Sequence, residues 1–432
     1  MRAKGSLMIR SSRLFVLNHL KRLSSGVPAT ATAEPRPAGS QIIESEASLR
    51  ERLDSDPENA DLLQQLCTYL TEQGTQIPLE LEERTLTAHL KRHPDRGDLQ
   101  ARLDQVRHML GKLSRDRENE RRLAEYRARR FLPPNLYVQI SNHCNLRCVM
   151  CGHKNAIKDD AHMDAAVFRR VLDEAQASKI ENLVFAAAFG ETLLHPQAID
   201  FLREAKERGF KITVATNGNF LDAEQIAQLA ALNLYCIQYS FFGYDKPTYE
   251  KTYIGGDFEK ASQNLRLLKG AIVQAGGQTT FMVNGINIKN DHERTEKTRA
   301  FLLSLGVEEN EIRLSMPNNF AGRISPGSFS SKIDGKSFKA VDELPRYICP
   351  QLLSTPGVMA DGRVTACGCL DNNGSLAIGD IRKNSLAEIR LGDRYQSMIR
   401  AFVDDDLSAF PMCAKCDVPY GNPDGSFNER PA

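Results

Sequence analysis

The stretch "NLYVQISNHCNLRCVMC", residues 135–151, joins a β-rich run to three closely spaced cysteines. The first seven residues predict a strand. Cys144, Cys148 and Cys151 follow in a polar, loop-like segment, at intervals of four and three residues. The chain has only ten cysteines in 432 residues, so this density indicates that the three thiols share one ligand.

Downstream of this stretch, β-rich runs and helical stretches alternate six times. The further β-rich runs are "NLVFAAAFG" (182–190), "KITVATNG" (211–218), "YCIQYSFFG" (235–243), "TTFMVNGI" (279–286) and "IRLSMPN" (312–318). Such alternation predicts an α/β fold, a parallel barrel or sheet with its function at the carboxyl ends of the strands. The polar residues near these ends are Ser141, Glu191, Asn217, Ser240, Asn284 and Asn318. The cysteine loop follows the first strand, so it lies at the functional end.

Three thiolates are enough to hold three irons of a [4Fe–4S] cluster. The fourth iron is then free of protein ligands and can bind a substrate or cofactor. A cluster held by four cysteines is usually only an electron carrier. The cysteine trio therefore indicates a reactive cluster.

The spacing C-x3-C-x2-C in this loop resembles the radical S-adenosylmethionine (radical SAM) enzymes, and residues 135–320 resemble their (β/α)6 partial TIM barrel. The resemblance implies that the open iron chelates the amino and carboxylate groups of S-adenosylmethionine. One electron, from a donor such as flavodoxin or ferredoxin, then cleaves the sulfonium. The resulting 5′-deoxyadenosyl radical abstracts hydrogen from a substrate.

Further positions carry over from the resemblance one at a time. The second strand ends in "FGE", where the family has Gly-Gly-Glu, so Gly190 and Glu191 are expected to bind the amino group of S-adenosylmethionine. The first glycine is replaced by Phe189, which leaves the close backbone approach at that position in doubt. An ordinary role for Glu191 as a turn residue stays open.

Three other residues are expected near the nucleoside of S-adenosylmethionine. Asn217 and Ser240 end the third and fourth strands, near the family's ribose-binding positions. Met150 stands before the third cysteine, where the family commonly has an aromatic residue near the adenine; methionine is a softer apolar replacement. Asn217 and Ser240 are also compatible with purely structural roles.

A second group of cysteines comprises Cys349, Cys367, Cys369, Cys413 and Cys416. Two pairs of thiolates could form a tetrahedral zinc site. The pattern C-x12-G-x4-C followed by C-x2-C instead resembles the SPASM/twitch auxiliary-cluster domain of radical SAM enzymes. By this resemblance all but Cys369 ligate one auxiliary [4Fe–4S] cluster. Cys369 is left as a bystander, an alternative ligand or a hydrogen-atom donor.

A cluster with four cysteine ligands is closed and serves electron transfer. A substrate radical formed by hydrogen abstraction is a strong reductant when it lies beside a heteroatom that can lose a proton. An auxiliary cluster that accepts its electron completes a two-electron oxidation. The second cysteine group therefore favours oxidation or bond formation over isomerisation.

Residues 45–111 contain an internal repeat, because "LRERLDSDPENADLLQQL" (49–66) aligns with "LTAHLKRHPDRGDLQARL" (86–103) at an offset of 37 residues. Leucines at helical spacing, interrupted by a proline, resemble tetratricopeptide-like (TPR-like) hairpins. A small helical domain with chance similarity is the alternative. A helical repeat would suit a peptide or protein partner better than a small metabolite.

Composition sets outer limits on the partners. The formal net charge is +1 and charged residues make up 26% of the chain. The protein therefore has no strong net positive charge that would attract nucleic acid. No apolar run is long enough to span a membrane. The first 33 residues hold six Lys and Arg and no acid, which fits a basic tail in a cytoplasmic protein or a mitochondrial transit peptide.

The sequence thus predicts a tail (1–44), a helical domain (45–131), a radical SAM core (132–325) and an iron–sulfur domain (340–432). The predicted enzyme is a radical SAM oxidoreductase or maturase that acts on a peptide, a protein or a small natural product. A dehydrogenase or epimerase of sugars or aminocyclitols is an alternative. So is a non-catalytic helical-repeat protein with structural metal sites.

Overall fold

The computed structural model describes residues 45–420, except 76, 153–160, 187–189, 287–291, 316–318, 325–345 and 372. Contacts divide the chain into two compact units, Met1–Ser114 and Arg115–Ala432. The predicted tail (1–44), Phe189 and Asn318 lie outside the described residues.

The first unit is helical and has its own core. Its helices are α2 (Glu46–Ser55), α3 (Ala60–Glu72), α4 (Leu79–Arg92) and the first part of α5 (Gly97–Ala128). Ser45 and Asn59 cap α2 and α3, since their side chains accept backbone N–H groups of the first turn. Leucines of α2 and α3 fill the core, but Leu86 and Leu90 of the second repeat are only half-buried. A tetratricopeptide-like identity therefore stays a prediction.

The second unit is built on a mostly parallel sheet, as the alternating pattern predicts. Its parallel strands are β1 (Asn135–Val138), β2 (Asn182–Phe185), β3 (Lys211–Thr216), β4 (Cys236–Ser240), β5 (Thr280–Ile286) and β6 (Ile312–Ser315). They pair in chain order, each with the next. Their carboxyl ends therefore meet at one edge.

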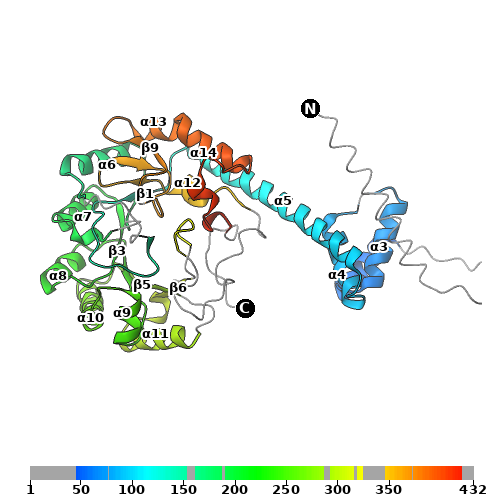
Figure 1. The fold of residues 1–432 in the computed structure, drawn as a ribbon, viewed down its shortest axis with the longest axis horizontal. Helices are drawn as coiled ribbons and strands as arrows, with labels where there is room; N and C mark the ends of the chain where they lie inside the picture. Colours follow the sequence, from blue (N-terminus) through cyan, green and yellow to red (C-terminus); the bar gives the residue numbers. More distant parts are fainter. Residues whose placement is uncertain are drawn as a thin grey trace, which may run out of the picture. The chain divides into compact units, whose positions relative to one another are not determined.

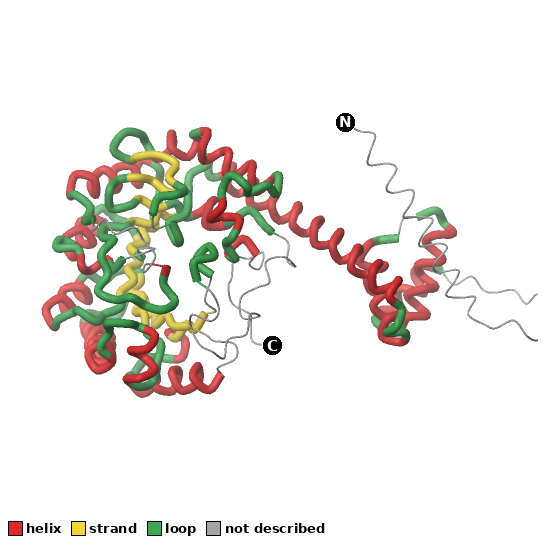
Figure 2. Tube along the Cα trace, in the orientation of Figure 1, coloured by secondary structure: helices red, strands yellow, loops and turns green. Residues whose placement is uncertain are grey.

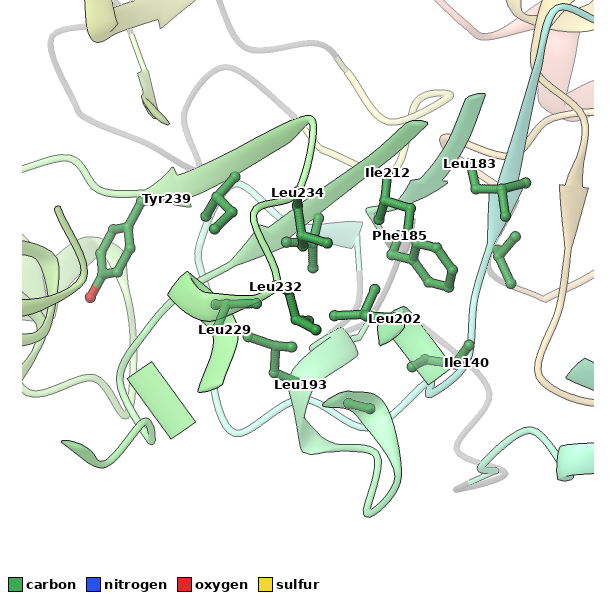
Figure 3. Close-up of a cluster of buried hydrophobic side chains, with 14 of the residues drawn as sticks. Ile140, Leu183, Phe185, Leu193, Leu202, Ile212, Leu229, Leu232, Leu234 and Tyr239 are labelled. Carbon is green, nitrogen blue, oxygen red and sulfur yellow. The ribbon is translucent and has the colours of Figure 1, made fainter. Parts of the chain in front are cut away.

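Helices cover the outer side of this sheet (Figures 1 and 2). They are α6 (Ala165–Ala177), α7 (Ala198–Glu207), α8 (Ala223–Ala231), α9 (Lys246–Thr252), α10 (Phe258–Gln274) and α11 (His292–Ser304). Alternate strand side chains meet the apolar faces of the helices in one core (Figure 3). Leu183 and Ile212 from the strands, for example, share this core with Leu202 and Leu229 from the helices.

The cysteine-rich C-terminal region extends the same sheet, which the sequence did not predict. Strand β7 (Gly357–Val358) pairs in parallel with β1, and β8 (Arg363–Thr365) and β9 (Ala377–Asp380) follow antiparallel. The helices of this region are α12 (Pro350–Ser354), α13 (Leu386–Leu391), α14 (Asp393–Val403) and α15 (Pro411–Ala414).

Two glycines allow this region to lie close against β1. A Cβ on Gly368 would lie 2.6 Å from the Cβ of Tyr137, and a Cβ on Gly357 would lie 2.7 Å from the Cα of Gly368. Real Cβ atoms do not tolerate such distances. The segment that carries Cys367 and Cys369 is thereby fixed on the first strand of the barrel.

In the part of the chain that the structure describes, no helix combines the length and the apolar character needed to cross a membrane.

Candidate functional site

The loop with the cysteine trio is held by backbone hydrogen bonds to the end of α9. The N–H of Arg147 donates to the carbonyl of Ile254 (2.9 Å), and that of Val149 donates to the carbonyl of Thr252 (3.0 Å). The Arg147 guanidinium closes the turn from outside through the carbonyl of Cys144 (2.8 Å). These bonds fix a loop that has no regular structure of its own.

The three thiols lie near one another in a partly buried site. Burial raises the pKa of Cys144 to about 11 and that of Cys148 well above its usual range. The neighbouring Cys151 raises both pKa values further. Arg147 is the cation beside Cys144, and its charge only partly opposes the effect of burial. Grouped thiols of this kind fit a metal cluster, because the metal supplies the positive charge that their thiolates need.

Glu191 connects the ends of three strands at this site. Its N–H donates to the carbonyl of His143 (2.5 Å) in the cysteine loop. Its carboxylate accepts the N–H of Asn217 (2.8 Å) after β3 and that of Leu193 (3.3 Å) after β2. The side chain is buried, and burial raises its pKa to about 7. The carboxylate is therefore poised to ionise when a cation binds beside it.

Gly190 is required by the close approach of two loops. Its φ is +147°, and a Cβ there would lie 2.4 Å from the carbonyl oxygen of Ser141. A side chain at this position would push the loop after β2 away from the loop after β1. The glycine thus sets the position of Glu191.

Asn217 contacts the cysteine loop directly. Its amide donates to the Asn145 side chain (2.9 Å), and its side-chain oxygen accepts the N–H of Asn219 (2.9 Å). Met150 is half-buried and packs against the core. Ser240 is half-buried at the end of β4, and in the described part of the chain no hydrogen bond joins its side chain to this group. The structure therefore brings Glu191 and Asn217, but not Ser240, into contact with the loop.

Sequence reasoning missed a row of histidines beside this loop. The rings of His143 and His162 stack at 5.1 Å, and His195 meets His162 edge-on at 5.1 Å. His195 accepts the N–H of Gln197 at Nδ1, so Nε2 carries the proton and donates to the carbonyl of Met163. Burial lowers the pKa of His195. Three single histidines in separate segments give no pattern by which a sequence could have revealed them.

Four cysteines of the second group surround a cavity of about 420 Å³, part of it open to solvent. Cys349, Cys367, Cys413 and Cys416 line it, together with apolar side chains such as Leu352. Burial raises the pKa of each of these thiols. The donor set and the apolar wall both fit a closed iron–sulfur cluster.

Cys369 does not line this cavity. Its thiol donates to the side-chain oxygen of Gln351 (3.2 Å), and the Tyr137 hydroxyl lies at hydrogen-bond distance on β1. Burial raises the pKa of this thiol to about 11. Its surroundings thus differ from those of the other four.

Helix α5 holds the segment that leads into Cys349. The side chain of Asn119 accepts the N–H of Ile348 (2.7 Å), and Arg122 donates to the Ile348 carbonyl (2.6 Å). Arg122 also pairs with Glu118 (2.7 Å) and is almost fully buried. The charge of Arg122 lowers the pKa of Cys349, against the larger effect of burial.

Comparison with known proteins gives two family matches. The model of the radical SAM superfamily matches residues 138–299, and that of SPASM, an iron–sulfur cluster-binding domain, matches residues 349–417. The chain therefore contains a radical SAM domain and a SPASM domain, as the cysteine patterns predicted. Its cofactors are S-adenosylmethionine and iron–sulfur clusters.

The individual relatives share at most about a quarter of their aligned residues with this chain. The chain is 25% identical over 316 residues to the tungsten-containing aldehyde ferredoxin oxidoreductase cofactor-modifying protein of Pyrococcus furiosus, covering 66% of this chain and 87% of that one. It is 22% identical to the AdoMet-dependent heme synthase of Methanosarcina barkeri, covering 44% of this chain and 54% of the relative. The crystal structure of Streptococcus suis SuiB bound to precursor peptide SuiA shares the fold, with a TM-score of 0.50 and 14% identity over 66% of this chain and 70% of SuiB.

Proposed function

We propose that this protein cleaves S-adenosylmethionine reductively to a 5′-deoxyadenosyl radical, which removes a hydrogen atom from a substrate. One observation carries the proposal. The loop that holds Cys144, Cys148 and Cys151 is hydrogen-bonded to Glu191, whose carboxylate is buried beside it. Iron ligands and an acidic partner for an amino group thus occupy one edge of the sheet, as the radical SAM reaction requires.

Each residue of this edge has a proposed role. The three thiolates would hold the open cluster, which, once reduced, would supply the electron for cleavage of bound S-adenosylmethionine. Glu191 receives the amino group of the cofactor, a role that its burial and its raised pKa support. Gly190 keeps Glu191 in place, Asn217 and Ser240 bind the ribose, and Met150 packs near the adenine.

The auxiliary cluster is proposed to be held by Cys349, Cys367, Cys413 and Cys416, which line one cavity. Thiolates on one zinc ion lie about 3.8 Å apart, given Zn–S bonds of about 2.3 Å. Among the described residues, no three of the cysteine Sγ atoms lie within 4.8 Å of one another. This wider spacing supports a cluster over a single ion. Cys369 is then a bystander to ligation.

The proposed substrate is a peptide, a protein or a small natural product that loses two electrons, one of them to the auxiliary cluster. The precursor peptide bound to SuiB supports a peptide substrate, and the name of the Pyrococcus protein, which describes it as cofactor-modifying, supports a small molecule. The proposed electron donor is a flavodoxin or a ferredoxin. A TPR-like first unit would recruit a peptide or protein partner.

Anaerobically reconstituted protein tests the reaction. With dithionite as reductant, wild type should form 5′-deoxyadenosine and methionine, and the Cys144→Ala, Cys148→Ala, Cys151→Ala triple variant should form neither. Turnover by the triple variant would defeat the ligand assignment. Failure of wild type to cleave S-adenosylmethionine, even with substrate extracts supplied, would favour a non-catalytic interaction protein.

A further inference from the structure

Arg390 is a fully buried cation in the last turn of α13. Its guanidinium lies between two aromatic rings, 5.2 Å from the centroid of Tyr126 and 4.1 Å from that of Tyr395. It donates to the carbonyls of Leu352 (3.0 Å) and Leu353 (2.9 Å), at the end of α12.

This cation has no carboxylate partner among the described residues: it contacts carbonyl oxygens and the uncharged side chain of Tyr126, and no ion pair includes it. An unpaired buried charge is strongly destabilising, and an arginine cannot escape by losing its proton. Carbonyl dipoles and ring faces compensate only in part. The position therefore requires a nearby anion.

The cavity lined by Cys349, Cys367, Cys413 and Cys416 adjoins the same short helix. Leu352, whose carbonyl accepts from Arg390, lines that cavity. Helix α12 begins directly after Cys349, so only two residues stand between this ligand and Leu352. The guanidinium is thus one hydrogen bond away from a residue that lines the cavity. The hydroxyl of Tyr395 donates to the same carbonyl (2.6 Å).

We infer that Arg390 is the buried counter-cation of the auxiliary cluster and raises its reduction potential. A cluster with four thiolate ligands is anionic, and reduction adds one more negative charge. A fixed cation that is itself buried and lies beside the cavity stabilises the reduced form more than the oxidised form. The inference rests on the proposed assignment of a cluster to this cavity.

This placement serves the proposed reaction. An auxiliary cluster with a higher potential accepts an electron from a substrate radical more readily. Arg122 also lies near Cys349, but its charge is offset by Glu118. Arg390, in contrast, has no acid among its described partners to offset its charge.

The experiment is a redox titration of the full-length chain, followed by the EPR signal of the reduced cluster. Cys144, Cys148 and Cys151 are replaced by Ala in every sample, so that only the auxiliary cluster remains. Arg390→Met should lower the reduction equilibrium constant about tenfold, which is 59 mV for one electron. Arg394→Met is the matched control, because Arg394 also donates to two carbonyls but is exposed. It should change the constant less than twofold.

A second pair of variants separates charge from packing. Arg390→Gln can still donate to the carbonyls and should give the same shift as Arg390→Met. Tyr395→Phe removes a hydrogen bond to the Leu352 carbonyl at constant charge and should shift the constant less than twofold. A shift in Tyr395→Phe as large as in Arg390→Met, or no shift in either neutral variant, would overturn the inference.

Some variants could lose the cluster and so could not be titrated, and measuring their iron content decides these cases. If both neutral variants lose the cluster while Arg390→Lys keeps it, the cation is needed to hold the anionic cluster, which supports the inference. Loss of iron from all three variants would show that Arg390 acts through packing, and would overturn it. Absence of a cluster before Arg390 is altered would instead refute the proposed auxiliary site.

Discussion

At the scale of single residues, Glu191 links the chemistry of the site to pH. Its pKa is about 7 in the fold without cofactor because burial disfavours the charged form. Binding a cationic amino group requires the ionised form, so affinity should fall as protons are added below pH 7. Lowering the pH from 8 to 6 should therefore weaken S-adenosylmethionine binding about tenfold, as measured by calorimetry on anaerobically reconstituted protein.

Glu191→Gln provides the control for this pH dependence. The variant keeps the shape of the side chain but cannot ionise, so its binding should be weak at both pH values. If the variant still loses about tenfold in S-adenosylmethionine affinity between pH 8 and pH 6, another group titrates, and the role proposed for Glu191 is contradicted.

Gly190 gives a second prediction at this scale. Gly190→Ala should lower the free energy of unfolding by at least about 2 kcal/mol, because it adds an unfavourable φ and a collision with Ser141. Gly276→Ala is the matched control: its φ is +98°, but no atom lies within 4 Å of the added Cβ. Denaturant unfolding of the two variants compares them. Equal losses would mean that the contact with Ser141 carries no energy.

The residues of the site were predictable to different degrees. The cysteines follow from their spacing, and Glu191 from its place after the second strand. The histidine row and Asn145 were not predictable, because their contacts depend on how loops from distant segments meet. The environment that separates Cys369 from its neighbours likewise depends on Tyr137, which lies more than 200 residues away in the chain.

At the scale of elements, the second half of α5 stabilises the iron–sulfur region through Arg122. Arg122→Met would leave the Ile348 carbonyl and the Glu118 carboxylate without this partner in a buried place. It should cost about 3 kcal/mol of unfolding free energy. The rate of amide hydrogen exchange of residues 346–354 should also rise in this variant.

The neighbouring Arg121 offers the control for this element. It pairs with Glu118 and Glu125, but its side chain is 51% exposed. Exposed ion pairs contribute little, so Arg121→Met should cost less than about 1 kcal/mol. Similar losses from both variants would show that α5 contributes helix stability only.

Elements with a clear period were predicted within a few residues of their observed ends. The strand predicted at 211–218, for instance, is Lys211–Thr216. Strands β7 and β8 escaped prediction, because two or three residues are too few to show a period. Strand β7 pairs with β1 and β8 pairs with β7, and the close approaches of Gly357 to Gly368 and of Gly368 to Tyr137 allow this packing.

At the scale of the whole molecule, the two units have separate cores, which makes the first one removable. Deletion of residues 1–114 should leave iron content and uncoupled S-adenosylmethionine cleavage unchanged within about twofold. If the first unit recruits substrate, native cell extract should stimulate the full-length enzyme and not the truncated one. Equal stimulation of both would refute partner docking by the helical unit.

The central claim is that one chain holds two iron–sulfur clusters, one open and one closed, in the proposed ligand sets. Iron analysis of anaerobically reconstituted protein tests it most directly. Wild type should contain about eight irons per chain, and about four should remain when either ligand set is replaced by Ala. Cys369→Ala should keep all eight. About four irons and one zinc in wild type would contradict the account.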